Sequence, residues 1–174
     1  GAGTLQDNGV NVTAGQFVSL ADINAGKLVF TPAADANGAG YASFTFRVQD
    51  DGGTANSGVD LDATPRTMSV NVTSVNDAPV GTDNTVTTLE GAAYTFTAGD
   101  FGFTDPADAA SVAGANALTA VKITTLPGAG TLQDDGVNVT AGQFVSLADI
   151  SAGKLVFTPA ANANGAAYAS FTFQ

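Results

Sequence analysis

The sequence predicts an all-β fold, in which antiparallel strands form two sheets packed over an apolar layer. Short runs rich in Val, Thr, Phe and Tyr are separated by clusters of Gly, Asn, Asp and Pro, which is the pattern of strands joined by turns. No window shows a sustained helical spacing of apolar residues. Because 44% of the 174 residues are apolar, the chain can bury a core. Many short strands with frequent turns favour a β-sandwich.

An internal duplication is the second observation. Residues 1–47 reappear as residues 128–174, and 42 of the 47 aligned positions are identical. Residue 1 aligns with residue 128, so the period is 127 residues. On this interpretation the chain starts and ends in the middle of a repeat. A copy this faithful favours tandem modules that serve extension or multivalent display.

Strands are predicted where apolar and polar residues alternate. In residues 41–48, Phe44, Phe46 and Val48 fall on one face, and polar residues stand between them. One face is therefore expected to be core and the other solvated. The same alternation predicts half-buried strands at residues 27–30, 68–73, 94–97, 118–123 and 154–157.

The connections carry signals of their own. Residues 7–9 (Asp-Asn-Gly) and their copy 134–136 (Asp-Asp-Gly) can supply the positive φ angles of a tight hairpin turn. Residues 19–23, with their copy 146–150, predict a single helical turn. Long loops are expected at residues 51–66 and 98–116.

A module boundary is predicted at residues 74–80, where the alternation stops and Pro79 removes a backbone donor. Residues 1–75 are then the C-terminal part of one repeat, residues 76–79 a linker, and residues 80–174 the N-terminal part of the next.

Each part is expected to lack strands that the other contains. The first lacks opening strands like residues 80–127, and the second lacks closing strands like residues 48–75. Two sources of the missing strands stay open. Neighbouring copies of the repeat in a longer chain can supply them, which we favour, or separate chains can exchange strands head to tail.

Charge and composition limit the classes of partner and metal that the chain can bind. The formal net charge is -11, from 16 acidic and 5 basic residues, which opposes binding to nucleic acid or anionic lipid. The chain has no Cys and no His, so oxygen atoms are the strong metal ligands available, and Ca²⁺ is the expected cofactor. No apolar run is long enough to predict insertion into a membrane.

The carboxylates gather in predicted loops and have two interpretations. Asp and Asn commonly stabilise turns by bonding their own backbone. Alternatively, clustered carboxylates bind Ca²⁺, because two of them about 4 to 5 Å apart repel by roughly 1 kcal/mol in water and by more when partly buried. A divalent cation reverses the sign of that interaction.

Two segments resemble a known family. Residues 44–53 (FTFRVQDDGG) and 68–79 (MSVNVTSVNDAP) look like the end of a bacterial cadherin-like repeat, an Ig-like sandwich of giant secreted adhesins of the RTX type. The resemblance implies an extracellular or cell-surface location and calcium between successive modules, which makes the array stiff.

The resemblance also implies ligands. Asn76 and Asp77 match the linker, Asp105 and Asp108 match the acidic loop of the following module, and Glu90 matches the acid that ends its first strand. Asp50, followed by Asp51, matches a late loop ligand. Ser74 stands where the family usually has Asp, which favours one ion per junction. The expected metal ligands are Asp50, Asp51, Asn76, Asp77, Glu90, Asp105 and Asp108.

No enzymatic activity is expected. Cys and His are absent, and a glycosidase needs aromatic platforms that a chain with no Trp and 3 Tyr supplies poorly. We expect a structural extender repeat of a bacterial adhesin that presents a distal binding domain, as in biofilm formation. Two alternatives stay open: a module that binds glycan or another cell through its loops, and a filament subunit that exchanges strands.

Overall fold

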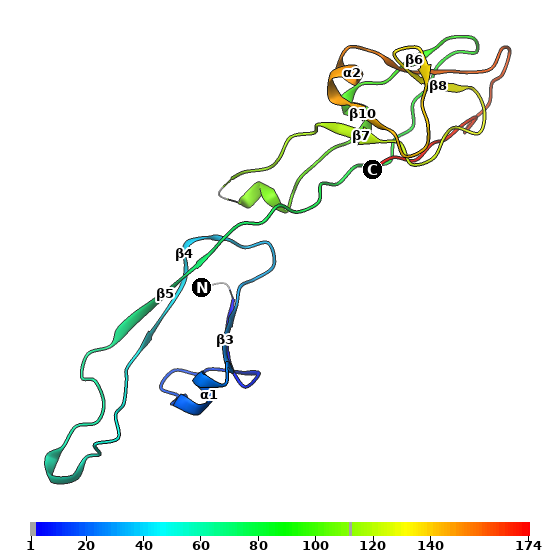
Figure 1. Ribbon diagram of the computed structural model, residues 1–174. Helices are drawn as coiled ribbons and strands as arrows, with labels where there is room; N and C mark the ends of the chain where they lie inside the picture. Colours follow the sequence, from blue (N-terminus) through cyan, green and yellow to red (C-terminus); the bar gives the residue numbers. More distant parts are fainter. Residues whose placement is uncertain (1–2, 112) are drawn as a thin grey trace. The chain divides into compact units, whose positions relative to one another are not determined.

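A computed structural model describes residues 3–111 and 113–174 (Figure 1). Most of its regular elements are β-strands in small antiparallel sheets, and helices are few and short, which confirms the all-β class. Within those residues no helix has the length and apolar character needed to cross a membrane. Residues 3–76 with 110–111 and 113–114 form one compact unit, and residues 77–109 with 115–174 form another.

The first unit contains two separate sheets and one helical turn. Its three-stranded sheet has the order β2-β1-β3, and its second sheet pairs β4 with β5. The bounds are β1 Thr4–Asp7, β2 Val10–Asn11, α1 Leu20–Asn24, β3 Leu28–Thr31, β4 Gly38–Phe46, a 3₁₀ turn at Ala55–Ser57, and β5 Arg66–Val72.

The second unit contains a four-stranded sheet of order β6-β11-β8-β9 and a two-stranded sheet that pairs β7 with β10. An isolated bridge joins Ile123 to Phe173 beyond the end of β7. The bounds are β6 Tyr94–Thr95, 3₁₀ turns at Ala98–Phe101 and Asp108–Ala110, β7 Ala120–Lys122, β8 Thr131–Asp134, β9 Val137–Asn138, β10 Phe144–Ser146, α2 Leu147–Ser151 and β11 Leu155–Thr158.

The two predicted hairpin turns are confirmed. Asn8 and Gly9 have φ angles of 50° and 78°, and their copies Asp135 and Gly136 have 51° and 78°. Both central residues of each turn are left-handed, as a two-residue hairpin with the right-handed twist of its strands requires. Each turn joins neighbouring antiparallel strands, β1 to β2 and β8 to β9.

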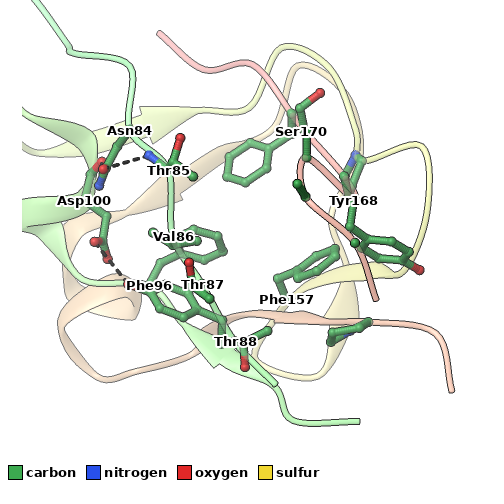
Figure 2. Close-up of a pocket in the computed structure, with 18 of the residues that line it drawn as sticks. Asn84, Thr85, Val86, Thr87, Thr88, Phe96, Asp100, Phe157, Tyr168 and Ser170 are labelled. Carbon is green, nitrogen blue, oxygen red and sulfur yellow. Dashed lines mark hydrogen bonds between the residues drawn. The ribbon is translucent and has the colours of Figure 1, made fainter. Parts of the chain in front are cut away.

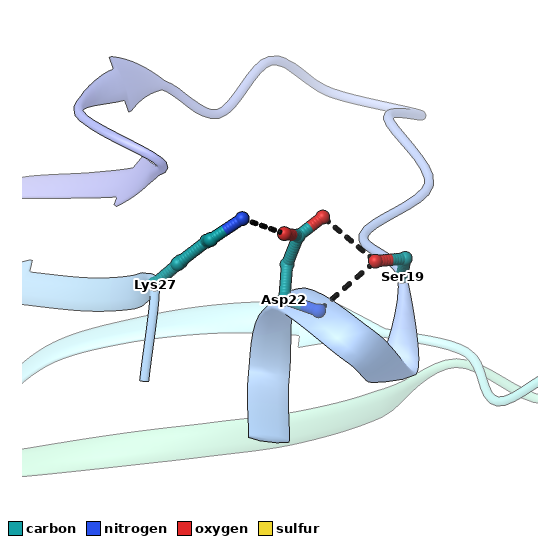
Figure 3. Close-up of polar contacts among 3 residues, drawn as sticks. All are labelled: Ser19, Asp22 and Lys27. Carbon is teal, nitrogen blue, oxygen red and sulfur yellow. Dashed lines mark hydrogen bonds and ion pairs between the residues drawn. The ribbon is translucent and has the colours of Figure 1, made fainter. Parts of the chain in front are cut away.

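The predicted helical turns are also confirmed, and each is stabilised by its own side chains. Figure 3 shows Asp22 between Ser19 and Lys27. The Asp22 backbone N–H donates to Ser19 Oγ at 3.0 Å, Ser19 Oγ donates to Asp22 Oδ2 at 2.7 Å, and Lys27 Nζ lies 2.7 Å from Asp22 Oδ1. Ser19 thus caps the first turn. The hydrogen bond from Lys27 and then that from Ser19 lower the pKa of Asp22.

The apolar core lies in the second unit. Residues 80–127 contribute four of its nine buried residues, and the second copy of the duplicated segment contributes five. Phe171 and Phe173 pack edge-on against this core, with ring centroids 5.4 Å from Phe96 and 5.0 Å from Phe101. The buried core residues are Phe96, Phe101, Val121, Ile123, Leu132, Val139, Val145, Ile150 and Leu155.

The first unit has no comparable core. None of its described residues is fully buried, and Ile23 is 47% exposed where its copy Ile150 is 1% exposed. The prediction that Val48 shares a buried face with Phe44 and Phe46 is wrong: β4 ends at Phe46, and Val48 is 60% exposed.

Candidate functional site

An acidic cluster forms at the start of the second unit. Val80 and Thr104 exchange two backbone hydrogen bonds of 2.8 Å, which bring the segment beginning at Asp77 beside the loop that contains Asp105 and Asp108. The loop is irregular because Pro106 follows Asp105 and a short 3₁₀ turn begins at Asp108. Three of the predicted ligands are therefore brought into one region.

Hydrogen bonds tie this cluster together. Asp108 Oδ2 accepts from the backbone N–H of Asp77 at 3.0 Å and from Asn116 Nδ2 at 3.1 Å. Asp105 Oδ2 accepts from the backbone N–H of Asn116 at 2.6 Å. Asp105 is 6% exposed and Asp108 is 3% exposed, although both are carboxylates. Burial of this kind costs stability unless the charge is paired or bound to a metal.

One oxygen of the cluster has no hydrogen-bond partner. Asp105 Oδ1 is buried and accepts no hydrogen bond. Nearly all buried polar atoms in proteins are paired, so an orphaned carboxylate oxygen is unusual. A hard cation such as Ca²⁺ fits the donors present, which are carboxylate and amide oxygens of Asp105, Asp108 and Asn116. Among residues 3–111 and 113–174, no three acidic residues gather closely enough to form a metal site by themselves, so the chain's carboxylates would supply part of the ligand set.

The remaining predicted ligands lie elsewhere in the chain. Asp50 and Asp51 are exposed residues of the first unit, and Asp50 Oδ1 accepts from the backbone N–H of Gly52 at 3.0 Å. A bond of this kind stabilises a turn, and the calcium role of Asp50 stays a prediction. Asn76 is exposed at the end of the first unit. Glu90 Oε2 accepts from Asn164 Nδ2 at 3.0 Å.

Asn116 belongs to the cluster but was not predicted. It stands alone in an Ala- and Gly-rich stretch without alternation, so no pattern in the sequence marks it. Its role depends on backbone geometry, because both its N–H and its side-chain amide reach the two buried carboxylates.

A groove of about 680 Å³ opens elsewhere in the second unit. Residues 84–90 line one side and residues 163–171 line the other. Figure 2 shows Thr85, Val86 and Thr88 facing the segment that carries Tyr168 and Ser170, with the ring of Phe157 between them. The lining is mainly apolar. Burial, and then the nearby Asp100, raises the pKa of Tyr94 at the groove wall.

Comparison with known protein families, with curated proteins and with solved structures gives no match.

Proposed function

We propose that the chain is part of a tandem array of Ig-like β-sandwich modules, and that its function is mechanical. In this proposal the repeat is an extender of a bacterial surface or secreted adhesin, and it spaces and presents a distal binding domain without catalysing a reaction. The observation that carries the proposal is the repeated local fold. The duplicated residues form β2-β1-β3 in the first unit and β9-β8-β11 in the second, each with the same hairpin turn and the same capped helical turn.

The two units together support a sandwich for the complete repeat. The second unit supplies the sheet β6-β11-β8-β9 and, separately, β10-β7 extended by the bridge to Phe173. In the first unit, β4 pairs with β5, and the sequence of β4 recurs at residues 165–173 of the second unit. If a complete repeat makes the strand pairs of both units, its strands fall into two sheets. An Ig-like sandwich consists of two such sheets.

We propose further that Ca²⁺ binds at Asp77, Asp105, Asp108 and Asn116. The support is the burial of two carboxylates with one orphaned oxygen, and the bond from the Asp77 backbone to Asp108. Asp77 belongs to the predicted linker, so an ion in this cluster would restrict the linker and stiffen the array. The family resemblance points to three of these residues, Asp77, Asp105 and Asp108.

Calcium titration of the full chain tests this part of the proposal. We expect binding with a Kd of ~10⁻⁴ to 10⁻³ M, typical of extracellular modules. At ten times the Kd, calcium stabilises the second unit by about 1.4 kcal/mol, which raises its melting temperature. Asp105→Asn is expected to abolish that response. Asp35→Asn is the matched control, because Asn162 already occupies the equivalent position in the second copy.

A response to calcium that survives Asp105→Asn would assign the ion to another site. Unchanged melting and unchanged proteolysis near residue 77 at 10 mM calcium, on the order of ten times the expected Kd, would remove calcium from the proposal.

The glycan-binding alternative has less support. The carboxylates of the long loop in the first unit are engaged within it: Asp60 Oδ2 accepts from Gln49 Nε2 at 2.9 Å, and Asp62 accepts from Thr64 and Arg66. The Thr64 backbone N–H, and then Arg66, lower the pKa of Asp62. Side chains already held this way are poorly placed to bind a sugar.

A further inference from the structure

The groove of the second unit runs between two segments that belong to no sheet along it. Residues 84–90 line one side and residues 163–171 line the other, and none of them lies in a strand. Within the second segment, Ala166 and Ala167 form a turn, and Ala167 has a positive φ of 53°. The surface between the two segments is mainly apolar. A segment outside every sheet offers an edge to which a strand can be added.

The backbone of residues 172–174 shows which edge is still open. Gln174 and Lys122 exchange backbone hydrogen bonds of 2.8 and 2.9 Å, and Thr124 N–H donates to Thr172 O at 2.8 Å. Alternate residues of a strand direct their N–H and C=O groups to opposite edges. Phe171 and Phe173 therefore present theirs away from the bonded segment. Within residues 3–111 and 113–174, neither makes a backbone hydrogen bond.

The first copy of the same sequence shows a strand that pairs with this segment. Residues 38–46 are the counterpart of residues 165–173, and in the first unit they form β4 and pair with β5. Phe44 lies opposite Met68, and Ala42 lies opposite Val70. The equivalent residues at the groove are Phe171 and Ala169.

The chemistry of β5 matches the groove. In Arg66–Val72 the apolar residues alternate with Thr67, Ser69 and Asn71, and Val70 is half-buried where Ser69 is exposed. In the groove, a strand in the same register would place Met68 and Val70 opposite Phe171 and Ala169, on the face where Phe171 contacts the core ring of Phe96. The polar residues would face solvent.

We propose that the groove is an acceptor site for one added β-strand, and that its occupant is a strand with the sequence of β5 from another copy of the repeat. The strand extends the sheet from β10 and β7 through residues 165–174, as in β-strand addition generally. This inference rests on the tandem-repeat part of the proposed function and is independent of calcium.

A synthetic peptide with the sequence of residues 64–75 is the probe. It is titrated into the full chain in EDTA, with affinity read by calorimetry and the site read by NMR. We expect it to bind and to protect the Phe171 and Phe173 amides from exchange. A Val70→Asp peptide should bind roughly tenfold more weakly or worse, because it buries a carboxylate against the core. A Ser69→Asp peptide, altered on the solvent face, should bind within about twofold.

Equal binding of the Val70→Asp peptide, or binding that leaves the Phe171 and Phe173 amides unprotected, would overturn the proposal. A free peptide loses conformational entropy when it binds, which weakens its affinity. A second arm reduces this loss by attaching the strand to the chain. The full chain is extended after Gln174 by the sequence of residues 48–75, with and without the Val70→Asp change in the extension. If the unaltered extension gives no protection at Phe171, the groove is not a strand acceptor. Neither arm contains calcium. A negative result in these arms therefore says nothing about calcium binding, and a negative calcium titration says nothing about strand binding.

Discussion

Residues 3–47 and 130–174 have nearly the same sequence but different surroundings, and this pair separates local from tertiary determinants of structure. The hairpin turn, the capped helical turn and the strand pairs β1·β3 and β8·β11 are the same in both copies. All of these elements lie within the duplicated segment, so both copies contain the partners that the elements need.

The flanking strands differ between the copies because their partners differ. Phe144–Ser146 is strand β10 beside β7, whereas residues 17–19, with the same sequence, are irregular in the first unit. Conversely, Gly38–Phe46 is a strand beside β5, whereas residues 165–172 are irregular. β-Propensity is the same in the first pair and nearly the same in the second, where only Gly40 and Ala167 differ, so the partner decides whether the strand forms.

The largest expected difference between the copies concerns Ile150 and Ile23. Ile150 is 1% exposed and Ile23 is 47% exposed. We expect Ile150→Ala to lower the free energy of unfolding of the second unit by about 2–5 kcal/mol, because it leaves a cavity in a packed core. Ile23→Ala should cost the first unit less than about 1 kcal/mol. Hydrogen exchange of the β1 amides measures the stability of the first unit, and that of the β8 amides measures the stability of the second. Equal losses would mean that the first unit buries Ile23 in solution.

The helix caps should behave alike in both copies. Ser19 and Ser146 each accept a hydrogen bond of 3.0 Å from the backbone N–H three residues later. We expect Ser19→Ala and Ser146→Ala each to cost about 1 kcal/mol of local stability, since the lost bond is local. Exchange of the Asp22 and Asp149 amides measures this directly. Ser→Thr at either position is the control that keeps the capping oxygen. A loss confined to Ser146→Ala would show that the cap depends on the core.

Much of the local structure could be predicted from the sequence. Alternation predicted β3, β4, β5, β6, β7 and β11, and Asn-Gly or Asp-Gly with a preceding Asp located the hairpin turns, because both signals depend on neighbouring residues. The remaining strands were not predicted from alternation: β1, β2, β8, β9 and β10. The strand bounds shifted by a few residues, as at Val48, because a strand ends where its partner leaves it. The unequal burial of Ile23 and Ile150 has no signature in the sequence, since the two residues lie in segments that are identical at 42 of 47 positions.

The candidate sites were predicted less completely. Asp105 and Asp108 were expected as ligands from the family resemblance, but their burial and the orphaned oxygen of Asp105 follow from how the loop folds back on Asp77. Asn116 joins them from a stretch without a motif. The groove is formed by segments about 80 residues apart in the sequence, residues 84–90 and 163–171, and a contact at that separation leaves no local pattern.

The smallest expected difference arises from one of the five positions at which the copies differ. Asp135 replaces Asn8 and adds an ion pair of 3.3 Å to Lys154, which also contacts Asp149 at 3.0 Å. Bonding to Asp149, and then to Asp135, raises the pKa of Lys154. A raised lysine pKa stabilises the fold below the unfolded pKa, and this contribution is lost as the pH rises through the folded pKa.

Asp135→Asn makes the second copy match the first at this position, where Lys27 contacts Asp22 and has no counterpart of Asp135. We expect the pKa of Lys154 to fall while staying above its usual value, because the bond to Asp149 remains. Stability near neutral pH should hardly change, since the pair is exposed and screened by solvent. NMR titration of the lysine side chain between pH 9 and 12, roughly the range around an ordinary lysine pKa, measures the shift, with Asn8→Asp as the reciprocal variant on Lys27. If Asn8→Asp raises the pKa of Lys27 as much as Asp135→Asn lowers that of Lys154, the ion pair depends on the hairpin alone and not on the core beneath it.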